Sequence, residues 1–174
     1  DGVSCSDPSP VTPRPDLSCC IYSREQLLNG RDRDDCVEGE VELVFDNATF
    51  CIDENETFLD LNNNQLTGEI PPEIGNLTNL TDLRLYDNQL TGEIPSTIGN
   101  LTNLIDLRLH YNQLTGIPPE IGNLTNLNYL NLHDNELTVV PSEIGNLTNL
   151  TNLYLSTNQL TGEIPVEIGN LTNL

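Results

Sequence analysis

The apolar positions of residues 53–174 follow a pattern whose period changes within each repeat of the chain. Leu83 and Leu85 alternate with polar neighbours such as Arg84, and a period of two predicts a short strand with one buried face. Pro95 and Gly99 interrupt the segment that follows, so no long helix fits there. Each repeat therefore predicts one coil, made of a strand, a turn, an extended return and a tight corner.

The string LTNLxxLxLxxNQLTGEIPxEIGN recurs five times, so the architecture is predicted from the repeat. One coil cannot bury its own leucines, whereas stacked coils bury them against the equivalent residues above and below. The units are 53–76, 77–100, 101–123, 124–146 and 147–170, followed by a partial unit at 171–174. In the second unit the expected core residues are Leu77, Leu80, Leu83, Leu85, Leu90, Ile94 and Ile98.

Two residue types recur at fixed positions outside this core. An inward asparagine can bond the backbone of its own turn and of the next coil, so we expect a structural ladder at Asn64, Asn88, Asn112, Asn135 and Asn158. Corners with positive φ are expected at Gly75, Gly99, Gly122, Gly145 and Gly169. Both columns are interpreted as structural and not as binding sites.

The repeat resembles the plant-type subclass of the leucine-rich repeat family, LxxLxLxxNxLTGxIPxxIGNL, over Asp53–Leu174. The resemblance implies a curved leucine-rich repeat solenoid with a parallel β-sheet on its concave face, an irregular or 3-10 convex side, and a cysteine-bearing N-terminal cap. Residues 115–118 and 138–141 are each one residue short of the TGEIP string. They resemble shorter variants without the extra strand after Thr-Gly, with a local change in curvature or twist.

The chain before the repeats divides into two segments. Residues 1–18 hold four prolines among Ser, Thr and Asp, which predicts an extended tail. Residues 19–52 are interpreted as the disulfide-bonded N-terminal cap that shields the first coil. Within it, a capping box at residues 23–26 predicts a short helix closed by Gly30, and Val41, Leu43 and Phe45 alternate as one strand.

All five cysteines precede the repeats, at Cys5, Cys19, Cys20, Cys36 and Cys51. No CxxC spacing occurs, which disfavours a zinc site, and dense cysteines in a small cap favour disulfides and secretion. Cys36 and Cys51 flank the expected strand and would close it as a hairpin. Cys5 is the candidate for the unusual thiol, while a bridge to Cys19 or Cys20 is equally open.

The net charge excludes several classes of function. There are 27 acidic residues against 6 cations, all of them Arg, and the formal charge is −21. Such a surface repels nucleic acid and anionic membrane faces. No apolar run approaches the roughly 18 residues that a membrane span needs, so we expect no membrane insertion in this segment. The opening Asp1-Gly2 suggests a chain that was processed or cut from a longer one.

Catalysis has little support, because the chain has no nucleophile elbow and no phosphate-binding glycine loop. His110 and His133 are expected on neighbouring coils, with Asp87 and Asp134 nearby. Exposed histidines on a polar sheet are the favoured interpretation, in place of a metal site. No cofactor is expected.

The outward columns of the strands vary most between units, and they are rich in Tyr, Arg and His, residue types that interfaces favour. The competing interpretation is a solvated sheet whose Asp–Arg pairs balance their own charge. The candidate binding face comprises Asp82, Arg84, Tyr86, Asp106, Arg108, His110, Tyr111, Tyr129, Asn131, His133 and Tyr154.

Asparagine followed by x-Thr occurs at nine positions, which are candidate glycosylation sites in a eukaryotic secreted protein. The alternative is that the repeated NLT is only a structural corner. The candidates are Asn47, Asn55, Asn76, Asn79, Asn100, Asn123, Asn146, Asn149 and Asn170.

The chain stops inside a unit, at Leu174, and three explanations stay open. The chain is a fragment of a longer array, its end is covered by the head of another subunit, or a frayed end is tolerated. We predict a non-catalytic, secreted or cell-surface scaffold that binds protein or glycan partners through its concave strand face. The alternative is a glycosylated subunit of an extracellular filament or coat that assembles head-to-tail. Ice or mineral binding is disfavoured because the strand columns are irregular.

Overall fold

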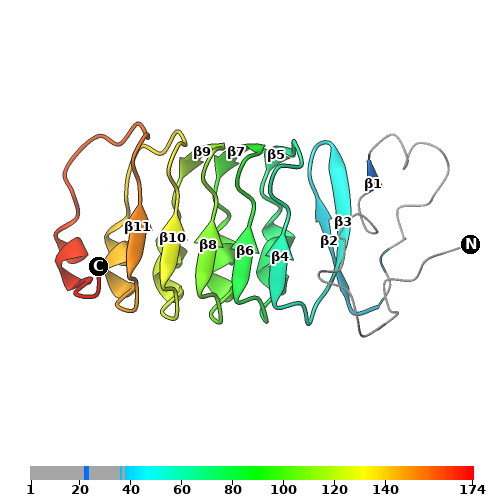
Figure 1. The fold of residues 1–174 in the computed structure, drawn as a ribbon, viewed down its shortest axis with the longest axis horizontal. Helices are drawn as coiled ribbons and strands as arrows, with labels where there is room; N and C mark the ends of the chain where they lie inside the picture. Colours follow the sequence, from blue (N-terminus) through cyan, green and yellow to red (C-terminus); the bar gives the residue numbers. More distant parts are fainter. Residues whose placement is uncertain (1–21, 24–35, 37) are drawn as a thin grey trace, which may run out of the picture.

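The computed structural model describes residues 22–23, 36 and 38–174, and it shows coils stacked along one axis (Figure 1). Each coil contributes one short strand to a parallel five-stranded sheet with the order β11-β10-β8-β6-β4. Neighbouring strands pair in register, with Leu83 beside Leu107 and Leu107 beside Leu130. The strands are β4 (Phe58–Asp60), β6 (Asp82–Arg84), β8 (Asp106–Arg108), β10 (Tyr129–Asn131) and β11 (Asn152–Tyr154).

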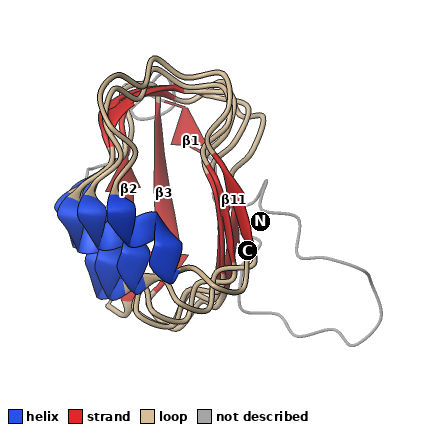
Figure 2. Cartoon of the chain, turned by 90° about the vertical axis from the view of Figure 1, so that its left-hand side faces the viewer, coloured by secondary structure: helices blue, strands red, loops and turns tan. Residues whose placement is uncertain are grey.

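The rest of each coil returns through a second strand or extended segment and a short 3-10 helix, and the helices lie across the coil from the main sheet (Figure 2). A proline precedes every one of these helices. The fixed φ of proline suits the residue at which the chain enters the helical turn. The helices are η2 (Pro72–Asn76), η3 (Ser96–Asn100), η4 (Pro119–Asn123), η5 (Ser142–Asn146) and η6 (Val166–Asn170).

The second sheet consists of β5 (Thr67–Glu69), β7 (Gln89–Glu93) and β9 (Gln113–Gly116). The expectation that both shorter units lack this strand is wrong for the third unit, because β9 forms there. Its pairing with β7 is irregular, because Gly92 pairs with Leu114 and Glu93 with Gly116, which leaves Thr115 between them without a partner on β7. Residues 138–141 form no strand, as expected, and the fifth unit has none either, because it lacks a neighbouring strand with which to pair.

The predicted core is confirmed. The seven residues expected in the second unit are at most 1% exposed. They belong to one apolar cluster that runs from Leu43 to Leu171 through every coil. Burying such side chains contributes roughly 1.5–3 kcal/mol each relative to exposing them, and here the contribution depends on the coil above and the coil below.

The predicted asparagine ladder is confirmed at Asn88, Asn112, Asn135 and Asn158, whereas Asn64, in the first coil, donates to the carbonyl oxygen of Asn62 in its own turn. Nδ2 of Asn112 donates to the carbonyl oxygens of Leu85 and Leu109, at 3.0 and 3.1 Å, while its Oδ1 accepts from the amide of Leu90 at 3.0 Å. One side chain thus joins two coils. Asn88, Asn135 and Asn158 make the equivalent bonds.

A second ladder, which sequence reasoning missed, runs along the corner between each 3-10 helix and the next strand. There Nδ2 of Asn103 donates to the carbonyl oxygen of Thr78 at 3.0 Å, and Nδ2 of Asn126 donates to that of Thr102 at 2.8 Å. The second asparagine of the repeated NLTN string is the signal that marks it. Asn79, Asn149 and Asn173 make the same bond.

The expectation of positive φ at the corner glycines is wrong. These glycines lie within the 3-10 helices, and among the described residues the positive-φ glycines are Gly39, Gly68, Gly92 and Gly162. The corner requires glycine because successive helices approach closely. A Cβ on Gly99 would lie 2.7 Å from the carbonyl oxygen of Glu120, which is closer than real Cβ atoms come.

The cap packs a hairpin against the first coil. Its strands are β2 (Glu40–Val44), the strand expected there, and β3 (Ala48–Asp53), which also pairs with β1 (Tyr22–Ser23). The rings of Phe45 and Phe50 meet edge to face at 5.8 Å. The expected bond between Cys36 and Cys51 is present, with an S–S distance of 2.01 Å.

Several expectations for the start of the chain lie outside the described residues. They are the extended tail at 1–18, the helix after residue 23, and the pairing of Cys5, Cys19 and Cys20. Among the described residues, no helix has the length and apolar character that crossing a membrane requires.

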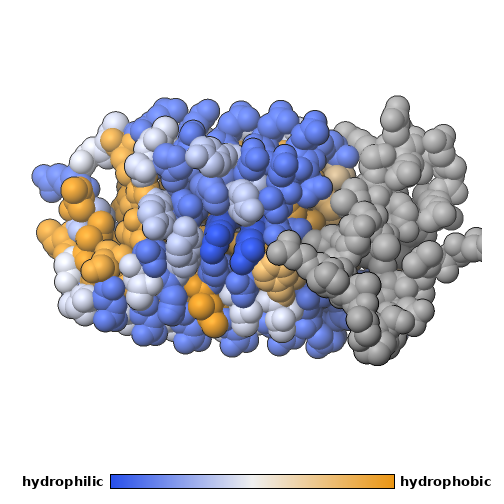
Figure 3. Space-filling model, viewed as in Figure 1, coloured by the Kyte–Doolittle hydropathy of each residue, from blue (hydrophilic) through white to orange (hydrophobic). Residues whose placement is uncertain are grey.

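The last described coil has the least covered apolar residues. Leu160 and Ile164 are 40% and 77% exposed, whereas their counterparts in the second unit, Leu90 and Ile94, are buried. Val166, which stands where the second unit has Ser96, is 87% exposed. On the face shown in Figure 3, hydrophobic residues gather at this C-terminal end, while hydrophilic residues dominate the middle of the stack.

The close approach of successive helices predicts that alanine destabilises the protein at one corner glycine and not at another. Gly99→Ala should lower the free energy of unfolding by about 1–3 kcal/mol, because the added methyl group overlaps Glu120. Gly169→Ala should change it by less than about 0.5 kcal/mol, since nothing lies within 4 Å of its Cβ position. Urea denaturation followed by circular dichroism measures both, and equal losses would contradict the packing explanation.

Candidate functional site

The strand face consists of the outward side chains of β4, β6, β8, β10 and β11 and of the turns that follow these strands. Alternation along β6 buries Leu83 and leaves Asp82 and Arg84 half-buried on the outer side. The pattern repeats in β8 and β10. Each functional side chain is thus attached to a short strand whose other face is anchored in the core.

The two arginines of the strand face are held by acidic neighbours and by aromatic rings. Arg108 donates from Nε and Nη2 to the two carboxylate oxygens of Asp106, at 2.9 and 2.7 Å. This bonding raises the pKa of Arg108 above its ordinary value, so the guanidinium stays charged. The guanidinium also lies over the ring of Tyr129, 4.6 Å from its centroid.

Arg84 occupies the equivalent place one coil earlier. Its guanidinium lies between Asp60 at 3.9 Å and Asp82 at 3.7 Å, and 4.8 Å above the ring of Phe58. The charges of both arginines are therefore balanced by neighbours on the same face. The Asp–Arg pairs that the competing interpretation expected are present. Phe58 and Asp60 were not among the predicted binding residues, although they stand in the same outward columns.

A row of aromatic and imidazole rings follows the arginines. Tyr86 and His110 stack with centroids 4.5 Å apart and planes 11° apart. Tyr111 contacts His110 at 5.3 Å and meets His133 nearly edge-on at 5.4 Å. The ring of Tyr111 thus links the two histidines into one continuous row. Tyr154 extends the arginine side of the face through its contact with Tyr129 at 5.5 Å.

The two histidines differ in their surroundings. Nδ1 of His133 lies 3.1 Å from the carbonyl oxygen of Ser156, so this nitrogen carries the proton and donates it. Burial lowers the pKa of His110, and the nearby Arg108 and His133 lower it further, against an opposing effect of Asp87. His110 is therefore neutral at pH 7.

Two buried polar atoms of the described strand face, Nε of Arg84 and Nδ1 of His110, have no hydrogen-bond partner. They lie on adjacent coils, next to the stack of Tyr86 on His110. Buried polar atoms without partners are uncommon in folded proteins, and they concentrate at sites with a function or with strain.

In the turn after each strand of the main sheet, one residue has a positive φ and adopts the left-handed backbone conformation. Asn63, Asp87 and Asp134 have φ of 54–56°, which suits Asn and Asp. Tyr111 and Thr157 adopt φ of 54° at the same position, although bulky and β-branched side chains disfavour it. Tyr111 is 49% exposed, so burial does not offset this strain.

The two histidines and their neighbours Asp87 and Asp134 belong to no close group of three or more candidate metal ligands among the described residues. Within the described part of the chain, the only group of His, Cys, Asp and Glu side chains close enough to share an ion is Cys36, Glu40 and Cys51. Its two sulfurs are joined in the disulfide and are not available as thiolates.

The candidate glycosylation sites lie away from the strand face. Asn47 donates from Nδ2 to the carbonyl oxygen of Gln65, and Asn79 and Asn149 belong to the corner ladder. Asn55 bonds Asp53. The other five are exposed at the ends of the 3-10 helices, with no hydrogen bond from their side chains: Asn76, Asn100, Asn123, Asn146 and Asn170.

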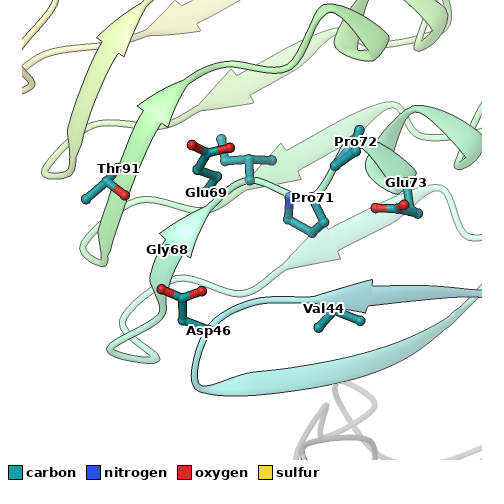
Figure 4. A pocket seen from close by; sticks show the side chains of 9 residues that line it. Val44, Asp46, Gly68, Glu69, Pro71, Pro72, Glu73 and Thr91 are labelled. Carbon is teal, nitrogen blue, oxygen red and sulfur yellow. The ribbon is translucent and has the colours of Figure 1, made fainter. Parts of the chain in front are cut away.

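Two adjoining hollows lie between the second sheet and the 3-10 helices, far from the strand face. The smaller one, of about 470 Å³, is lined by Val44, Gly68, Glu69 and Pro72 among others (Figure 4). The larger, of about 820 Å³, extends along the stack to Thr138 and Val139. Nothing in the sequence reasoning singled out this region.

All eleven predicted binding residues lie on the strand face or in its turns, and most of them contact one another. Asn131 lies on β10 between Arg108 and Tyr154, and its Oδ1 accepts a hydrogen bond from the amide of His133. Their role in binding stays a prediction. Sequence reasoning missed the ring contacts, because the columns show which residues face outward and not which way each side chain turns.

Two family models match the chain. The leucine rich repeat model matches residues 102–160, and a model for two copies of leucine rich repeats matches residues 57–99. No curated protein sequence matches significantly.

Solved structures of plant receptors match the repeats. The ectodomain of the receptor kinase GASSHO1/SCHENGEN3 from Arabidopsis thaliana, in complex with CASPARIAN STRIP INTEGRITY FACTOR 2, is 47% identical with a TM-score of 0.65. The match covers 67% of this chain and 14% of that one. The plant peptide hormone receptor RGFR1, in complex with RGF2, is 48% identical with a TM-score of 0.66, and the match covers 68% and 19%.

A plant ice-binding protein also matches, with 39% identity and a TM-score of 0.58, over 66% of this chain and 37% of that one. The chain thus spans less than a quarter of the two matched receptor structures and over a third of the ice-binding protein.

The lowered pKa of His110 predicts a pH dependence of stability. A lowered folded pKa means that this contribution to stability is present above the ordinary pKa of 6.5 and is lost as pH falls through the folded value. His110→Phe keeps a ring against Tyr86 but does not titrate. The native chain should therefore lose stability relative to this variant between pH 7.5 and pH 5, measured by urea denaturation. A constant difference across this range would contradict the assignment.

The left-handed turn predicts a stabilising substitution at Thr157. Thr157→Asn should raise the free energy of unfolding by about 1 kcal/mol, because Asn tolerates φ of 54° better than Thr does and Thr157 has no ring contacts to lose. Tyr111→Asn relieves the same strain but loses the ring contacts with His110 and His133, so it should gain less than Thr157→Asn. A loss of stability in both variants, measured by thermal denaturation, would show that the turn is not strained.

Proposed function

Because the chain belongs to the plant-type leucine-rich repeat family, we propose that it is a non-catalytic scaffold that binds a protein ligand across its strand face. The observation that carries the proposal is the strand face itself. Arg84, Arg108 and the row from Tyr86 to His133 form one contiguous surface on strands anchored in the core.

Preorganisation supports this assignment. The guanidinium of Arg108 is fixed by two bonds to Asp106 and by the ring of Tyr129, and Tyr86 is fixed by its stack on His110. Side chains that are already ordered lose little freedom when a ligand binds, so more of the contact energy appears as affinity. Tyr and Arg are also the residues that most often dominate the energetics of interfaces.

Strain at Tyr111 is a second supporting observation. A tyrosine with φ of 54° lowers the stability of the fold and leaves half of its side chain exposed. Such strain is typical of positions whose side chain serves a ligand. Since Tyr111 also links the two histidines, we place it at the centre of the contact surface.

The charge of the face favours a ligand recognised by stacking and hydrogen bonding. Both arginines are paired with carboxylates on the same face, while the chain as a whole carries −21. A strongly acidic ligand would be repelled by the protein's overall field. The matched receptors, whose structures contain CASPARIAN STRIP INTEGRITY FACTOR 2 and RGF2, are consistent with a protein or peptide ligand.

We place the protein outside the cell or at its surface. The Cys36–Cys51 disulfide favours an oxidising compartment, and the matched GASSHO1/SCHENGEN3 structure is the ectodomain of a membrane receptor kinase. We further propose glycans on the exposed helix-end asparagines. Attached there, they would leave the strand face open.

Selection of peptides from a random displayed library on the immobilised protein tests the function. Selected peptides should bind Arg108→Ala and Tyr129→Ala more than tenfold more weakly, because these variants remove the cation–π pair and an aromatic anchor. Ser142→Ala, exposed at the start of η5 and outside every candidate glycosylation sequence, is the matched control and should bind normally. Peptides indifferent to the strand-face variants would refute the assignment.

The same preparation separates the alternatives. Binding to an array of glycans but to no peptide would assign a glycan ligand to the face. The filament alternative predicts elongation with rising concentration, whereas a binding module gives one species by light scattering at every concentration tested. Ice binding, suggested by the name of one matched structure, is not favoured at the strand face, whose columns mix acidic, basic and aromatic residues.

A further inference from the structure

The flank groove consists of the two adjoining hollows between the second sheet and the 3-10 helices. Figure 2 shows that these helices lie on the other side of the coil from the main sheet. The hollows share Glu69, Ile70 and Pro72, so they form one continuous depression along the stack. Figure 4 shows Glu69 and Pro72 along the part near β5. The groove is independent of the function proposed for the strand face.

Glu69 and Glu93 place exposed carboxylates on successive coils along this groove, whose lining also includes Asp46, Glu73 and Glu120. The side chain of Glu69 lies over Gly92 of the next coil, where a Cβ would be 2.9 Å from Cγ, and Glu93 lies over Gly116 in the same way. Successive coils are about 4.8 Å apart, and like charges at such spacing repel. The only cations of the described residues, Arg84 and Arg108, lie on the strand face and are paired there.

The row of glutamates ends at the third unit, whose repeat is one residue shorter. The third unit lacks the glutamate of TGEIP, so nothing lies over the corresponding position of the fourth coil. That coil carries Val139 where the earlier coils have Gly68, Gly92 and Gly116. Val139 is 59% exposed at the end of the groove, with Thr138 beside it. An exposed apolar side chain at the end of a row of carboxylates distinguishes this surface from an ordinary acidic flank.

We propose that the flank groove binds an extended cationic segment of a partner protein. In it, two arginine or lysine side chains face Glu69 and Glu93, and an apolar side chain packs on Val139. Charge complementarity selects this occupant, because the described residues that line the groove include carboxylates and no arginine, lysine or histidine. The apolar end sets the direction and the register of the segment.

The spacing of the coils defines a probe. Glu69 and Val139 belong to units three coils apart, which corresponds to about 14 Å along the stack. In an extended chain, residues four apart are separated by about 13 Å. The amidated peptide Arg-Ser-Arg-Ser-Leu therefore places its two arginines at the glutamates and its leucine at Val139, while Arg-Ser-Arg-Ser-Ser lacks the apolar anchor.

Titration of the full chain with each peptide at low salt, followed by amide NMR shifts, tests the proposal. The leucine peptide should shift the amides around Glu69, Glu93 and Val139. The double variant Glu69→Gln/Glu93→Gln should weaken it about 5–10-fold. Val139→Ser should weaken the leucine peptide about threefold and leave the serine peptide unchanged.

The control removes the same two charges elsewhere. Glu54→Gln/Glu56→Gln lies in the exposed turn after β3, outside the groove, and should weaken the peptide less than twofold. Equal weakening by both double variants would mean that the peptide senses only the overall negative field, and would overturn the proposal. So would shifts confined to the strand face, an absence of binding, or amides that respond to Ca²⁺ but not to the peptide.

Discussion

The stacking of coils depends on satisfying the backbone groups that each turn exposes to the interior. Asn112 shows how this is done, since one side chain accepts from Leu90 and donates to Leu85 and Leu109, on two coils. Each backbone group left without a partner would cost about 1–3 kcal/mol. The asparagine at this position therefore holds neighbouring coils in one register, and that register aligns the outward columns of the strand face.

Periodicity and composition predict most of this architecture, because the properties involved are local to one repeat. Alternation around Leu83 predicts the strand, and a polar residue recurring within an apolar string predicts the ladder. Expectations failed where a residue's role depends on the neighbouring coil. Gly99 is required by the approach of Glu120, and the string alone cannot distinguish such a close contact from positive φ. Strand β9 survives in a shortened unit because β7 lies beside it.

The strand face likewise has features that the sequence predicts and features that it does not. Which residues face outward follows from the alternation, so the columns that carry Arg84, Tyr86 and His110 were predictable. The stack of Tyr86 on His110 and the packing of Arg84 on Phe58 were not, because they depend on side-chain rotamers across two coils. The strain at Tyr111 was equally hidden, since the left-handed turn is visible only in the backbone.

Coupling between successive coils also explains why the two faces are separable. Glu93 requires glycine at residue 116 on the next coil, and the missing glutamate of the third unit permits Val139 on the fourth. These contacts join the return segments of neighbouring coils, whereas the contacts of Arg84 and Arg108 with Phe58 and Tyr129 join neighbouring strands of the main sheet. Between the two lies a core of buried leucine and isoleucine that is nearly constant from unit to unit. The asparagine ladder connects the two sides, since Asn112 accepts from the amide of Leu90 in β7 and donates to the carbonyl oxygens of Leu85 and Leu109 beside the main sheet. Surface substitutions that leave this ladder intact should therefore change one side without changing the register of the other.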